Sequence, residues 1–89
     1  MASIRELKKY INNVLGDIIE AVYIWELTNP EKDTKKSEAI IDEAIDTFDD
    51  LIIKVNLKDV KSKKKHFKGV NQELEDRGRK LIDKINALN

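Results

Sequence analysis

Residues 4–27 read IRELKKYINNVLGDIIEAVYIWEL, with apolar side chains recurring at steps of three and four. This spacing puts the apolar side chains along one side of an α-helix, so the segment is expected to be a helix with a single core-facing side. Ser3 and Glu6 fit a capping box at its start, in which each side chain satisfies a free backbone N–H group. The core-facing positions are Ile4, Leu7, Ile11, Val14, Ile18, Ala21 and Trp25.

A proline separates this helix from a second periodic segment. Asn29-Pro30 is expected to end the first helix, because the residue before a proline avoids α geometry. The second helix is expected over about residues 34–55, and its start stays open between Pro30 and Ser37. Its apolar positions are Ile40, Ile41, Ala44, Ile45, Phe48, Leu51, Ile52 and Val55.

The third periodic segment covers about residues 59–88, and Asp59 is expected to cap its start. Gly69 leaves open whether this helix is continuous, because glycine is a weak helix former. Gly78 falls on the apolar side, where we expect it to make room for Trp25. The apolar positions are Val60, Phe67, Val70, Leu74, Leu81, Ile82, Ile85 and Leu88.

Three helices of similar length, joined by short connections, predict an all-α fold. Short connections make neighbouring helices antiparallel, so the expected architecture is an up-down-up three-helix bundle. The 89 residues provide one domain, 1–89, with helices at about 4–27, 34–55 and 59–88. The chain has no cysteine, which excludes disulfides and thiolate metal sites.

The apolar segments do not predict a membrane protein. The first residues lack the basic start of a signal peptide. The longest nearly apolar stretch, residues 18–27, contains two glutamates and is too short to span a bilayer. We therefore expect a cytoplasmic protein with no membrane partner.

Charge is balanced over the whole chain but uneven along it. Seventeen basic and seventeen acidic residues give a net charge of zero. Residues 37–50 contain six acids and no base, and a lysine-rich segment follows. The candidate basic patch in that segment consists of Lys58, Lys61, Lys63, Lys64, Lys65 and Lys68.

This patch has two interpretations. Clustered cations bind the phosphates of nucleic acid or an anionic surface. However, the segment contains no arginine, and its one aromatic residue, Phe67, belongs to the apolar side of the helix. A solvated helix face is therefore the preferred interpretation, and nucleic-acid or anionic-surface binding is the alternative.

No residue pattern indicates catalysis or metal binding. His66 is the only histidine, and no nucleophile–base pair can be assembled around it. The acids of the second helix share one outward side, and no glycine-bearing loop orders them around a cation. We expect no enzyme activity, no catalytic residues, no cofactor and no metal.

The end of the first helix is apolar almost all round. Since a three-helix bundle buries one side of each helix, Tyr23, Ile24 and Leu27 are expected to lie off the core. The connection 28–36 can fold over them, they can be ordinary exposed apolar residues, or they can form a surface for a partner. The leading hypothesis is a small non-enzymatic protein-interaction module that binds an unknown protein or a second copy of itself through these three residues.

Overall fold

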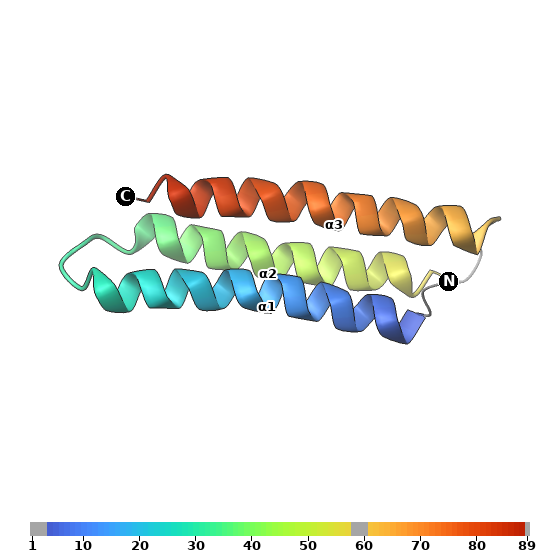
Figure 1. Ribbon diagram of the computed structural model, residues 1–89, viewed down its shortest axis with the longest axis horizontal. Coiled ribbons are helices and arrows are strands. Elements are labelled where there is room, and N and C mark those ends of the chain that lie inside the picture. The colour runs from blue at the N-terminus through green and yellow to red at the C-terminus, as the bar shows by residue number, and fades with distance from the viewer. Residues whose placement is uncertain (1–3, 58–60, 89) are drawn as a thin grey trace.

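The computed structural model of the protein describes residues 4–57 and 61–88. It contains three helices, α1 (Ile4–Thr28), α2 (Lys35–Val55) and α3 (Lys63–Asn86). They lie side by side, run in alternating directions and form an elongated bundle in which every pair of helices is in contact (Figure 1). The expected all-α, up-down-up three-helix bundle is therefore confirmed. Within the described residues, no helix is both long enough and apolar enough to cross a membrane.

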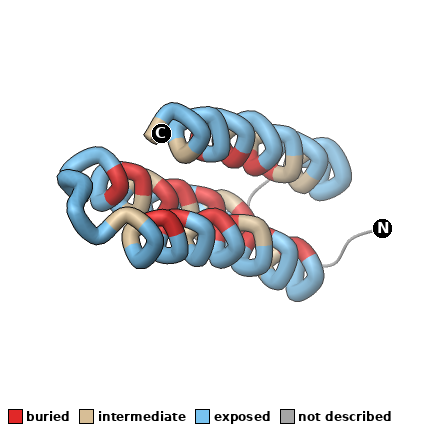
Figure 2. Tube along the Cα trace, turned by 60° about the vertical axis from the view of Figure 1, so that its left-hand side comes forward, coloured by how far each residue is buried: buried red, intermediate tan, exposed pale blue. Residues whose placement is uncertain are grey.

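The core runs along the bundle axis, where one side of each helix faces the other two (Figure 2). The buried core residues are Leu7, Ile11, Leu15, Ile18, Val22, Ile40, Ala44, Leu51, Val55, Val70, Leu74 and Leu81. Phe48 and Phe67 are partly buried and pack against this cluster, and Trp25 is buried at its end. The helical spacing therefore identified most of the core correctly.

Some core predictions at the edges of the apolar sides are wrong. Ile4, Ala21, Ile45 and Ile82 are exposed, because the edge of a helix's apolar side is covered only where a neighbouring helix reaches it. Two polar residues of α2 are buried in addition. These are Ser37 and Thr47, and the Thr47 hydroxyl donates to the carbonyl of Glu43 at 2.7 Å.

The connection between α1 and α2 starts where the sequence predicts. Asn29 Nδ2 donates to the carbonyl of Trp25 at 2.9 Å, which satisfies a carbonyl left free at the end of α1. Helix α2 begins at Lys35, between the two limits that the sequence left open. The Asp33 carboxylate accepts from the Lys35 backbone N–H at 3.0 Å and so stabilises this start.

Helix α3 begins later than expected and is continuous. It runs from Lys63 to Asn86 instead of over 59–88, because the Ser62 side chain caps it by accepting from the backbone N–H of Lys65 at 3.4 Å. The predicted cap Asp59 and the predicted core residue Val60 lie outside the described residues. The helix shows no break at Gly69.

Gly78 lies against a different part of α1 than expected. A Cβ atom at this position would meet Val14 Cγ1 at 3.7 Å and Ile18 Cδ1 at 3.8 Å, so Gly78 does not make room for Trp25. The late start of α3 accounts for part of this difference. A shift of four residues moves every α3 residue by about 6 Å along the bundle, which is slightly more than one helical turn.

Candidate interaction surfaces

The predicted partner surface occupies the outward side of the last two turns of α1. Tyr23, Ile24 and Leu27 are 51%, 52% and 80% exposed, respectively. Val22 and Trp25, next to them in sequence, are buried, because the core side of the helix faces the opposite way. Since residues three and four apart are neighbours on a helix, Leu27 adjoins both other residues. The connection 28–36 leaves Leu27 uncovered, so the alternative in which it shields this surface is wrong.

A second set of exposed apolar side chains lies on other parts of the bundle. Ile53 is 63% exposed and projects outward from α2. Tyr10 and Ile82 are 44% and 48% exposed and both line one cavity between α1 and α3. The spacing alone put Ile82 in the core, so the sequence did not reveal this cavity.

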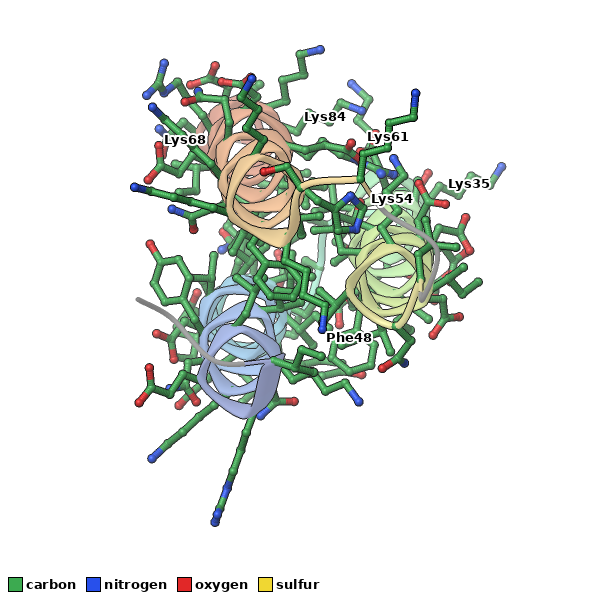
Figure 3. The ribbon with its side chains drawn as sticks, turned by 90° about the vertical axis from the view of Figure 1, so that its right-hand side faces the viewer. Lys35, Phe48, Lys54, Lys61, Lys68 and Lys84 are labelled. Atoms are coloured by element: carbon green, nitrogen blue, oxygen red, sulfur yellow. The ribbon has the colours of Figure 1, made fainter. Side chains whose placement is uncertain are left out.

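The lysines of the candidate basic patch surround the beginning of α3. Lys61, Lys63, Lys64, Lys65 and Lys68 are all exposed, and Lys58 lies outside the described residues. Lys61 and Lys68 extend to opposite sides of the helix, so the lysines do not share one flat face (Figure 3).

The start of α3 is electrostatically unusual. Its first turn contains no acidic residue, although acids near a helix N-terminus complement the positive end of the helix dipole. In the part of the chain that the structure describes, none of the five lysines forms an ion pair. The beginning of α3 is therefore strongly positive.

Two acids of α2, Asp50 and Glu43, are paired with a different part of α3. Arg77 Nη1 lies 2.8 Å from Asp50 Oδ2 and 3.0 Å from Glu73 Oε2, and Lys54 Nζ lies 2.7 Å from Glu73 Oε1. The hydrogen bond from Arg77, and then the charge of Lys54, hold the pKa of Asp50 below its usual value. The hydrogen bond from Lys54 likewise lowers the pKa of Glu73, against the opposing effect of its partial burial.

A second ion pair joins the same two helices farther along the bundle. Lys84 Nζ lies 2.6 Å from Glu43 Oε2. The contacts between α2 and α3 could not be predicted from the sequence, because their partners are separated by 19 to 41 residues and meet only when the two helices pack, whereas Glu73 and Arg77 lie four residues apart on α3. Two of the six acids of residues 37–50, Glu43 and Asp50, are therefore paired with bases within the chain.

His66 has a structural partner. Its Nε2 lies 2.5 Å from the backbone carbonyl of Lys54, near the end of α2. A carbonyl oxygen only accepts, so Nε2 must carry a proton in this contact. The ring thus satisfies a carbonyl near a helix terminus. Over residues 4–57 and 61–88, no group of three or more His, Cys, Asp or Glu side chains is placed to hold a metal.

An extended hollow lies between α1 and α3. One cavity of about 520 Å³ and another of about 260 Å³ share Tyr10, and together we call them the α1–α3 groove. The first is lined by Glu6, Leu7, Tyr10, Lys64, Phe67, Lys68 and Asn71. The second is lined by Tyr10, Val14, Leu74, Glu75, Gly78, Arg79 and Ile82.

Comparison of the chain with protein-family models, with curated proteins and with solved structures found no match in any of the three. Its function is therefore argued from its own surfaces.

Proposed function

We propose that the protein is a cytoplasmic, non-enzymatic interaction module that binds another protein through Tyr23, Ile24 and Leu27. The supporting observation is the 80% exposure of Leu27 beside two further half-exposed apolar side chains. Fully burying a leucine or isoleucine side chain contributes about 1.5–3 kcal/mol, so three adjacent apolar residues are enough to anchor a partner.

The charges around this surface indicate the chemistry of the partner. Residues 10–31 contain four acids, Asp17, Glu20, Glu26 and Glu31, and no lysine or arginine. Opposite charges at the rim of an interface speed association and fix its orientation. The expected partner therefore presents apolar side chains at the centre of its docking surface and basic residues around them.

A pull-down with matched variants tests this proposal. Leu27→Asp introduces a charge into the surface, and Ile53→Asp is the control, because Ile53 is a comparably exposed isoleucine on the outward side of α2. Both variants should keep the helical circular-dichroism spectrum of the parent protein. A partner recovered at high salt by the parent and by Ile53→Asp, but not by Leu27→Asp, supports the proposal. Equal recovery by all three proteins refutes it.

The second candidate function is binding of nucleic acid or another anionic surface through the lysines at the start of α3. The observation favouring it is that Lys61, Lys63, Lys64, Lys65 and Lys68 are exposed and form no ion pair among the described residues. Such binding weakens steeply with added salt, because it releases counterions. A gel-shift titration at low salt tests it, and an unretarded nucleic-acid probe rules it out.

A further inference from the structure

The α1–α3 groove has an apolar floor that the chain itself leaves partly open. Leu7, Val14 and Phe67 line it, and the half-exposed Tyr10 and Ile82 lie at its edges. Asn71 also lines the groove, and its buried Oδ1 has no hydrogen-bond partner among the described residues. The floor therefore offers mainly apolar side chains to a molecule packed over it.

The two edges of the groove carry opposite charges. Glu6 and Tyr10 line it from α1, and steps of three and four residues continue this edge through Asn13 to Asp17 and Glu20. On the other side, α3 contributes Lys64, Lys68 and Arg79, together with the acid Glu75. The α1 edge is therefore acidic, and the α3 edge is mainly basic.

We propose that a second copy of the chain packs on this groove, with α1 of each copy lying over α3 of the other. The interface is centred on the floor of the groove and not on Tyr23, Ile24 and Leu27, although the acids Asp17 and Glu20 border both surfaces. Its two-fold axis runs parallel to the helices. This orientation brings the acidic edge of one copy against the basic edge of its partner. An axis perpendicular to the helices would place α1 over α1 and α3 over α3, which opposes like charges.

The levels of the charged residues also match in this arrangement. Glu6, Lys64 and Lys68 line the same cavity, and Gly78, next to Arg79, lies against Val14 and Ile18, which flank Asp17. Rotation about a two-fold axis parallel to the helices leaves each residue at the same position along the length of the bundle. Asp17 of one copy therefore meets Arg79 of the other, and Glu6 meets the lysine pair.

The long side of the bundle is large enough to hold an interface of standard size. Its long side measures 50 by 16 Å, or about 800 Å² in projection. This is close to the roughly 800 Å² that each partner contributes to a standard protein interface.

A charge swap measured by analytical ultracentrifugation tests the dimer. Asp17→Arg and Arg79→Asp should each weaken dimerisation by about tenfold or more, because like charges then face each other across the interface. The double variant restores opposite charges and should dimerise nearly as well as the parent protein. Asp46→Arg, a charge reversal on the exposed outward side of α2, is the control and should have no effect. All three positions of change are exposed, and circular dichroism checks that each of the four variants remains folded.

The parent protein should be dimeric at roughly 0.1–1 mM. A monomer throughout that range overturns the inference, as does a dimer that Asp17→Arg and Arg79→Asp leave unchanged. A dimer disrupted by Leu27→Asp, but by neither charge reversal, also overturns it and assigns self-association to the end of α1. The proposed function thus stands or falls separately from the groove dimer.

Discussion

Replacing Gly78 by alanine should stabilise the bundle, although this glycine is buried where two helices pack. Gly78 lies in the interior of α3, and no described glycine has a positive φ, so alanine fits the backbone conformation. Alanine is favoured over glycine in a helix interior by about 0.8–1.0 kcal/mol. The remaining question is whether the space beside α1 accepts a methyl group.

The distances to α1 indicate that it does. The added Cβ would lie 3.7 Å from Val14 Cγ1 and 3.8 Å from Ile18 Cδ1, both ordinary van der Waals separations. Burying the methyl group contributes up to about 0.8 kcal/mol. The total expected gain is therefore about 1–1.5 kcal/mol in the free energy of unfolding, or roughly 4–12 °C in melting temperature for a domain of this size.

Two other glycines provide the control. Nothing lies within 4 Å of a Cβ built on Gly16 or Gly69, so alanine there adds helix propensity without new packing contacts. Each should gain about 0.5–1 kcal/mol. Urea denaturation followed by circular dichroism, at two protein concentrations, measures all three variants and separates folding from association. If Gly78→Ala destabilises while the two controls stabilise, α3 packs closer to α1 than these distances state, and the reasoning is refuted.

Three further predictions concern the core, the α1–α2 contact and the ionic network. Leu51→Ala should lower the free energy of unfolding, measured in urea, by about 2–5 kcal/mol, because Leu51 is fully buried. A loss below about 1 kcal/mol would contradict its core position. Ser37→Ala should lower the free energy of unfolding by about 1 kcal/mol, because the buried Ser37 hydroxyl lies 2.5 Å from Glu26 Oε2. A double-mutant cycle with Glu26→Gln should show coupling between the two residues, and purely additive losses would contradict this contact. Glu73→Gln should reduce the acid sensitivity of the fold. Folding lowers the pKa values of Asp50 and Glu73. The two carboxylates therefore stabilise the fold above their unfolded-state pKa values, and this stabilisation is lost as the pH falls through their folded-state pKa values. Unfolding free energies measured from about pH 6 to pH 2 should therefore decline less in the variant than in the parent, and equal declines would exclude this role for Glu73.

The candidate partner surface was predictable because it follows from a local excess of apolar residues. One side of a helix is enough to build a three-helix core, so Tyr23, Ile24 and Leu27 had to lie elsewhere. The α1–α3 groove was not predictable. Its existence depends on how closely two particular helices approach, and the spacing of Ile82 resembles that of a core residue.

The sequence by itself determined the number of helices, their approximate ends and most of the buried residues. These features depend on local patterns a few helical turns long, namely the apolar periodicity and helix-ending residues such as Pro30. Only the tertiary structure decided the rotation and the relative level of the helices. The packing of the helices buried Ser37 and left Ile45 exposed. It also set Gly78 against Val14 and joined Arg77 to Asp50. The physical reason is that a residue's burial and its charge partner depend on the neighbouring helix, whose position is fixed by the packing of all three helices together and not by the pattern of any one of them.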